Sequence, residues 1–235
     1  MRIASFSLAA LALSGAAIAF QQPAEKSSPQ DAQVIAQQLP SYPLDKCPVS
    51  GEELGGTMGD PVNFVQEGRL VRFCCKDCIK DFKKDPAVVL KQIDEAVVKA
   101  QKASYPLAKC PVSGKELASM GEPLDYVHGT RLVRFCCKDC VGTFQKDPAK
   151  VMAQIDKGLI DAQKKTYPLT TCPISSKLIE GEGVDYLYGT RLVRFCCPKC
   201  PEAFLKDPAK HLAQLDAAGK KAKEAGSSPG EKKGG

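Results

Sequence analysis

The sequence is poor in the residues that build one large hydrophobic core. It has no Trp among 235 residues, only 6% of its residues are aromatic, and many of its 43% hydrophobic residues are Ala. The length alone allows one or two ordinary domains. The shortage of large apolar side chains argues against a single large core.

Patterns typical of enzymes and of nucleic-acid-binding proteins are also missing. The chain has two His, and it contains no Ser-His-Asp set, no phosphate-binding glycine loop and no paired carboxylates. The formal charge of +6 is modest, and Lys clusters lie next to Asp and Glu, which indicates a solvated surface. We therefore expect no enzymatic activity and no nucleic-acid partner.

One apolar run stands at the start of the chain. Arg2 precedes an apolar stretch (3–13), and Ala17 and Ala19 provide the small residues of a signal-peptidase site. We predict that residues 1–19 are a signal peptide and that the protein is periplasmic or secreted, with no stable membrane insertion after cleavage. The alternative is an uncleaved anchor, because the whole apolar stretch approaches the length of a spanning helix.

The rest of the sequence contains one unit three times. A Tyr-Pro-Leu phrase before a Cys-Pro pair, the phrase Arg-Leu-Val-Arg-Phe-Cys-Cys and the phrase Lys-Asp-Pro-Ala recur in this order about 60 residues apart. We assign repeats 1, 2 and 3 to residues 42–104, 105–166 and 167–218. Residues 20–41 are interpreted as a linker, and residues 219–235 as a disordered basic tail.

The sequence pattern of each repeat predicts a small α+β domain. In repeat 1, extended segments at 62–65 and 70–73 indicate a β-hairpin, and a short helix ending near Lys84 follows. Asp85-Pro86 is typical of an N-cap and a first helical residue, so a longer helix is expected to begin there. Its core stripe is predicted from helical spacing. The stripe comprises Leu90, Ile93 and Val97 in repeat 1, Met152, Ile155 and Leu159 in repeat 2, and Leu212 and Leu215 in repeat 3.

A folded unit of about 50 residues is rarely stable on its apolar core alone and commonly needs disulfides or a metal. Each repeat supplies four cysteines, one isolated beside Pro in a turn and three in a Cys-Cys-x-x-Cys cluster where a strand becomes a helix. A helix N-terminus favours the thiolate, which is the form that ligates metals, so all are candidate ligands of Zn(II) or Cu(I), about one ion per repeat. The twelve candidates are Cys47, Cys74, Cys75 and Cys78; Cys110, Cys136, Cys137 and Cys140; and Cys172, Cys196, Cys197 and Cys200.

Two other interpretations of the cysteines stay open. Two disulfides per repeat would staple a structural or interaction protein, although the adjacent Cys74 and Cys75 cannot bridge each other without strain. The pair Cys75 and Cys78 has the Cys-x-x-Cys spacing of a thiol–disulfide oxidoreductase, although the usual βαβ context of that motif is missing.

The repeats share a further pattern: a Cys-Pro turn that ends in Ser-Gly or Ser-Ser, a hairpin ending in Phe-Cys, a second Cys four positions on, then Phe and an Asp-Pro helix start. Its members are Cys47-Pro48-Val49-Ser50-Gly51, Phe73-Cys74, Cys78, Phe82 and Asp85-Pro86; Cys110, Phe135-Cys136, Cys140, Phe144 and Asp147-Pro148; and Cys172, Phe195-Cys196, Cys200, Phe204 and Asp207-Pro208. This pattern resembles the YHS and TRASH-like heavy-metal-binding domains. The family often places its first Cys directly before the Gly, where this chain has Ser50, Ser113 and Ser175.

The resemblance implies three tandem treble-clef-like modules that ligate a metal through the matching cysteines. It implies a role in metal sensing, trafficking or resistance, with metal ions as partners and a metal-donor or acceptor protein as a further expected partner. The two histidines, His128 and His211, are each confined to one repeat and are expected at surface and packing positions. Arg72, with Arg134 and Arg194 at the same place in the other repeats, is expected either to offset thiolate charge or to face solvent.

The clustered sulfurs of one repeat are not equivalent. Neighbours on an extended strand point to opposite faces, so Cys74 and Cys75 do not easily aim at one ion unless the chain has already turned into the helix. The resemblance assigns Cys74 to a ligand position, Cys78 lies about one helical turn on, and Cys47 arrives from the distant turn. We predict these three to be the essential ligands of repeat 1, with Cys75 a fourth ligand at best.

The first prediction concerns processing. We expect the exported protein to begin at Phe20, because Ala17 and Ala19 satisfy the signal peptidase. N-terminal sequencing of the exported product checks this, and a membrane-bound product that retains Met1 would contradict it.

Overall fold

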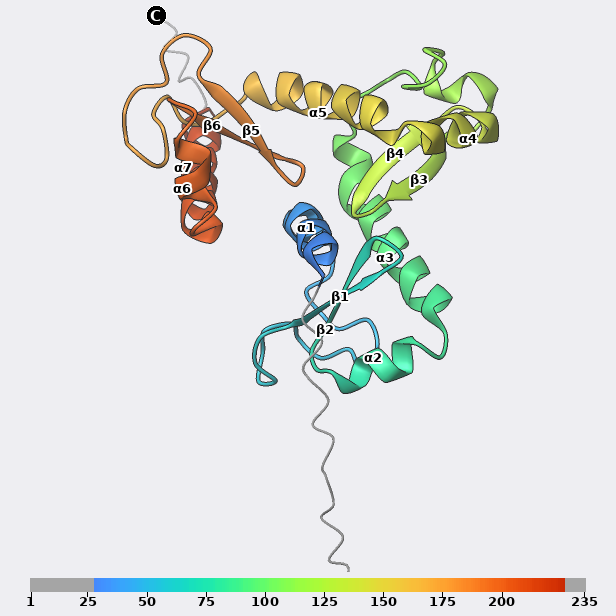
Figure 1. Cartoon of the computed structure of the whole chain (residues 1–235). Coiled ribbons are helices and arrows are strands. Elements are labelled where there is room, and N and C mark those ends of the chain that lie inside the picture. The colour runs from blue at the N-terminus through green and yellow to red at the C-terminus, as the bar shows by residue number, and fades with distance from the viewer. Residues whose placement is uncertain (1–27, 227–235) are drawn as a thin grey trace, which may run out of the picture.

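The computed structural model describes residues 28–226 as three β-hairpins, each followed by a short and a longer helix (Figure 1). This is the small α+β organisation that the sequence predicted. The predicted signal peptide, residues 1–19, lies outside the described residues. Within residues 28–226 no helix is both long and apolar enough to cross a membrane.

The three hairpins are alike. Each pairs two five-residue strands in antiparallel register around a two-residue turn, so that Val62 in repeat 1 faces Phe73. The predicted extended segments are confirmed to within one residue at each end. The strands are β1 (Val62–Gln66) and β2 (Arg69–Phe73), β3 (Leu124–His128) and β4 (Arg131–Phe135), and β5 (Val184–Tyr188) and β6 (Arg191–Phe195).

Two helices follow each hairpin. The short ones are α2 (Asp77–Phe82), α4 (Lys138–Lys146) and α6 (Cys200–Phe204), and the longer ones are α3 (Pro86–Gln101), α5 (Pro148–Lys164) and α7 (Pro208–Gly226). Short 3-10 helices occur at η1 (Leu39–Ser41), η2 (Lys102–Ser104) and η3 (Leu117–Met120). The longer helices begin at Pro as predicted. The carboxylates of Asp147 and Asp207 cap α5 and α7, because each accepts a hydrogen bond from the backbone N–H three residues further along the chain. Asp85, before α3, makes no such bond.

The core of each repeat lies between its hairpin and its helices. Three aromatic rings pack together in repeat 1, and Phe73 and Phe82 have their centroids 5.4 Å apart with Phe64 beside both. The buried stripe of α3 is Val89, Ile93 and Val97, so its first member lies one residue earlier than predicted and Leu90 is only half-buried. The inward face of this helix follows a spacing of four rather than three residues. In repeat 2 the buried residue is likewise Val151, and the predicted Met152 is half-buried. In repeat 3 Leu215 is buried as predicted, whereas Leu212 is half-buried.

A helix occupies part of the segment interpreted as a linker. Helix α1 (Pro29–Gln38) begins at Ser28, whose side chain and that of Asp31 each accept a hydrogen bond from the other's backbone N–H. This capping box stabilises the first turn. Helix α1 packs on β1 and β2 as α3 packs on β3 and β4. It therefore stands in the same place before repeat 1 as the longer helices stand before repeats 2 and 3.

One glutamine joins each of these helices to the hairpin of the following repeat. The Gln101 side chain donates to the carbonyl of Thr130 (2.8 Å) and accepts from the N–H of Leu132 (2.9 Å). Gln38 and Gln163 make the same two bonds to the hairpins of repeats 1 and 3. The buried Leu132 also joins the core cluster of repeat 1. Helices α3 and α5 are thus each shared by two repeats, whereas the predicted boundaries assign each helix to one repeat.

The hairpin tips of repeats 2 and 3 also reach α1 and η1. The buried hydroxyl of Thr130 donates to the carbonyl of Gln38 (3.0 Å) and lies 2.7 Å from the Ser41 hydroxyl. At the tip of repeat 3, a Cβ on Gly189 would lie 2.8 Å from the carbonyl oxygen of Pro40, so only Gly fits this approach. Figure 1 accordingly shows α1 among the three hairpins.

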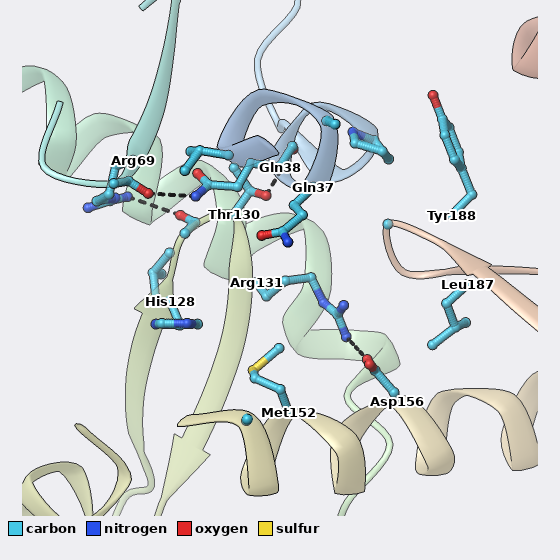
Figure 2. A pocket seen from close by; sticks show the side chains of 18 of the residues that line it. Gln37, Gln38, Arg69, His128, Thr130, Arg131, Met152, Asp156, Leu187 and Tyr188 are labelled. Atoms are coloured by element: carbon cyan, nitrogen blue, oxygen red, sulfur yellow. Dashed lines mark hydrogen bonds and ion pairs between the residues drawn. The ribbon is translucent and has the colours of Figure 1, made fainter. Parts of the chain in front are cut away.

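A cavity of about 960 Å³ lies between these tips. Figure 2 shows the polar side chains that line it. The Arg131 guanidinium is paired with Asp156 at 2.7 Å, and the Gln38 side chain makes hydrogen bonds to the hairpin of repeat 1. Met152, Leu187 and Tyr188 supply the apolar part. The Arg131–Asp156 pair lies within repeat 2, whereas the Arg69 guanidinium of repeat 1 donates to the carbonyl of Gly129 in repeat 2 (3.4 Å) and so joins these two repeats.

The predicted tail needs a correction at its start. Helix α7 continues to Gly226, so residues 219–226 are helical. Lys and Ala, which make up most of this segment, are good helix formers, so its basic charge does not prevent the helix from continuing. Residues 227–235 lie outside the described residues.

We predict that Gln101→Met destabilises the junction between repeats 1 and 2. The substitution keeps the length of the side chain but leaves a carbonyl and an N–H unpaired in a partly buried place, which costs roughly 1–3 kcal/mol. Denaturant unfolding measures the loss, and the matched control is Gln92→Met at an exposed position of the same helix. Equal effects of the two substitutions would contradict the bridging role.

Candidate metal centre

The isolated cysteine of each repeat is held in a tight turn. In repeat 1 the Cys47 N–H donates to the carbonyl of Glu52 (2.7 Å), and the Cys47 carbonyl accepts from Gly51 (2.9 Å). Gly51 adopts a φ of +77°, the left-handed region that suits Gly. The backbone thus points the Cys47 side chain inward, and only 2% of this residue is exposed.

The cysteine cluster lies where the hairpin meets the short helix. Cys74 follows the last residue of β2, and Cys78 lies in the first turn of α2. The buried rings of Phe73 and Phe82 flank this connection and fix it against the core. The two segments that carry cysteines are therefore brought together by the packing of the hairpin and the helix.

In every repeat three sulfurs meet at one point. Their Sγ atoms lie within 4.8 Å of one another, which is a spacing that one metal ion can bridge. All members are buried except Cys196, which is half-buried. We call these sets the triads: Cys47, Cys74 and Cys78; Cys110, Cys136 and Cys140; and Cys172, Cys196 and Cys200.

The remaining cysteine of each repeat lies beside its triad and is partly exposed. The Sγ of Cys75 is 3.7 Å from that of Cys78. Cys137 and Cys140 are 3.6 Å apart, and Cys197 and Cys200 are 3.3 Å apart. We call Cys75, Cys137 and Cys197 the peripheral cysteines. All twelve cysteines are free thiols in this structure.

A serine hydroxyl stands next to each triad. The Ser50 hydroxyl lies 3.2 Å from the Sγ of Cys74, and Ser113 and Ser175 repeat this contact at the same distance. These are the residues at which the chain departs from the YHS pattern. In this contact either the hydroxyl or the thiol can be the donor.

The isolated cysteines are the acidic members of the triads. Burial raises the pKa of the Cys47 thiol, but hydrogen bonds from the Ser50 hydroxyl and from nearby backbone N–H groups outweigh burial and lower the pKa to about 6. The same balance brings the pKa of Cys110 and of Cys172 to about 6. A thiolate at this position is ready to accept a metal ion.

The triad cysteine that lies in the short helix of each repeat has a raised pKa instead of a lowered one. Burial, together with hydrogen bonds to the neighbouring sulfurs, raises the pKa of Cys78 and of Cys140 to about 12, and it also raises that of Cys200. A second or third thiolate in a buried triad repels the first. A bound cation would remove that penalty, because coordination deprotonates a thiol outright.

The other residues singled out in the sequence lie away from the triads. The guanidinium of Arg72 lies over the Tyr42 ring, 5.7 Å from its centroid, and its Nε donates to Asn63. Arg134 and Arg194 make the equivalent contacts with Tyr105 and Tyr167 and pair with Asp125 and Asp185. These arginines therefore contact the neighbouring strand of their hairpin and the tyrosine of the Tyr-Pro-Leu segment.

The two histidines serve packing. His128 is an exposed residue whose ring meets Phe144 edge to face, 5.3 Å between centroids. His211 takes the helix position of Val89 and Val151 and lies beside Phe204. Its Nδ1 is buried without a hydrogen-bond partner in the part of the chain that the structure describes. Neither histidine joins a triad.

Sequence reasoning missed the serines as neighbours of the sulfurs. The signal was present, because a serine stands three residues after the isolated cysteine in all three repeats. The arrangement offers each repeat a compact, sulfur-only donor set of the kind that thiophilic metals prefer. The chain matches no protein-family model, no curated protein and no solved structure.

The turn of repeat 3 yields a prediction. Ser176, at the position of Gly51 and Gly114, has a φ of +58°. Relieving this left-handed conformation with Ser176→Gly should stabilise repeat 3 by about 0.5–1 kcal/mol, measured by denaturant unfolding. The reciprocal control, Gly114→Ser, should destabilise repeat 2 by a similar amount. A loss of stability in Ser176→Gly would contradict the assignment of strain.

Proposed function

We propose that the protein binds thiophilic metal ions, one per repeat, in its three cysteine triads. The observation that carries the proposal is that the three sulfurs of each repeat, from segments more than 20 residues apart, converge within 4.8 Å in all three repeats. Random placement of cysteines would not give the same geometry three times. Such a small domain also gains folding energy from a bound metal.

Zn(II) and Cu(I) are the ions that fit this chemistry. Both are selected by thiolates. Zn(II) prefers four ligands in a tetrahedron, so in repeat 1 it would need a donor besides the triad. The Cys75 sulfur and the Ser50 hydroxyl are the nearest candidates. Cu(I) accepts fewer ligands, and the triad would suffice for it.

The proposal includes the role and the place of the protein. We assign it to metal trafficking or resistance outside the cytosol, without an enzymatic reaction, as a row of treble-clef-like modules related to the YHS and TRASH domains. Support comes from the order of elements in each repeat, a cysteine turn, then a hairpin, then a helix that carries the last ligand. The signal peptide that the sequence predicts at residues 1–19 supports the export that we propose.

We predict that the reduced protein binds three equivalents of Zn(II) or Cu(I) and that Cys136→Ser lowers this number to two. The substitution removes a buried triad sulfur, so the site of repeat 2 loses a ligand while the others stay intact. Native mass spectrometry under anaerobic conditions counts the ions.

The matched control is Cys137→Ser, which changes the adjacent peripheral cysteine and should retain three Cu(I) ions, for which the triad suffices. Uptake of at most one ion by the unaltered chain would contradict the proposal. Six disulfides and no bound metal in the native protein would instead favour the disulfide-stapled alternative.

A further inference from the structure

The peripheral cysteines occupy the same place in all three repeats. Each precedes the short helix of its repeat, and its sulfur touches the helical member of the triad at 3.3–3.7 Å. The other triad sulfurs are largely covered, since Cys47 is 2% and Cys74 3% exposed. The peripheral sulfur therefore lies between the buried triad and solvent.

This placement matters for how an ion leaves. An ion held only by buried sulfurs would have to break its bonds before any acceptor reached it, and a bare ion in a buried place is costly. A sulfur that touches the triad and also reaches solvent offers a route in which one bond forms as another breaks. The neighbouring residues Lys76 and Asp77 are exposed, so an acceptor can approach this side.

We infer that Cys75, Cys137 and Cys197 are exchange ligands, through which the ion passes from the triad to an acceptor that carries thiols. The inference rests on the proposed function. A thiol acceptor is indicated because an ion selected by three thiolates moves downhill only to ligands of equal softness. Repetition in three modules shows that the arrangement is a property of the unit.

The transfer proceeds by ligand substitution, without electron transfer. The sulfur of Cys75 bonds to the ion as a thiolate while one triad sulfur leaves it, and the Cys75 proton passes to the sulfur that leaves. An acceptor thiol then bonds as a thiolate, and its proton passes to the released cysteine sulfur. The remaining protein bonds break in turn as a second acceptor thiol binds. The three protein sulfurs released first end as thiols, the last one to leave takes a proton from solvent, and the acceptor holds the ion.

Repeat 3 has the most open route. Cys196 is half-buried, whereas Cys74 and Cys136 are buried. Its peripheral sulfur also approaches the triad most closely, at 3.3 Å from Cys200. The ion of repeat 3 should therefore be the first to leave.

The test is a transfer experiment with the full chain. The protein is loaded anaerobically with Cu(I) and mixed with a synthetic peptide that exposes a Cys-x-x-Cys pair, and mass spectrometry follows the ions on both partners. The variant carries Cys75→Ser, Cys137→Ser and Cys197→Ser. We expect it to load three ions but to transfer them about tenfold more slowly, because the bridging step is lost and the barrier rises.

The matched control replaces the exposed lysine of each loop, as Lys76→Ser, Lys138→Ser and Lys199→Ser, and should transfer at the unaltered rate. If the triple cysteine variant transfers as fast as the unaltered protein, the exchange role is wrong and metal binding stands. If this variant no longer loads three ions, the peripheral cysteines are obligate ligands and the exchange role is also wrong. If the unaltered chain loads no ions, the proposed function itself fails.

Discussion

The convergence of three sulfurs is the constraint on which each repeat depends. A small domain without Trp, with one aromatic cluster and one helical stripe, has little apolar surface to bury. The packing of the hairpin and the helix brings the turn and the hairpin-helix connection to one point, and it concentrates there groups that repel one another once they lose their protons. The aromatic cluster next to the triad therefore has to hold these groups together whether or not an ion is bound.

The sequence predicted the elements better than the way they are joined. The hairpins and the Asp-Pro helix starts were predictable, because two-residue turns, alternating apolar residues and proline each impose a local geometry. Val89 shows where local reasoning stops. Both it and Leu90 are apolar at helical positions, and only the direction from which the hairpin packs decides which one is buried.

The triads could be anticipated from spacing, whereas their surroundings could not. Cys78 lies one helical turn beyond Cys74, a local relation that the sequence displays. The contact of Ser50 with Cys74 joins residues 24 apart and depends on the fold of the whole repeat. The glutamine bridges are similar, since Gln101 meets a hairpin about 30 residues further on. The short helix α1 was missed because its partners, the strands of repeat 1, lie far along the chain.

The position of α1 has a consequence for the order of assembly. This helix has ten residues, none of them buried, and a helix of that length is marginal by itself in water. Its last residue, Gln38, contacts Thr130, and η1 directly after it meets Gly189, so both contacts join residues far apart in the chain. Contacts between such distant residues form late, because the loop that they close is long. We therefore expect α1, which precedes all three hairpins in the chain, to reach its final contacts after the separate modules have formed.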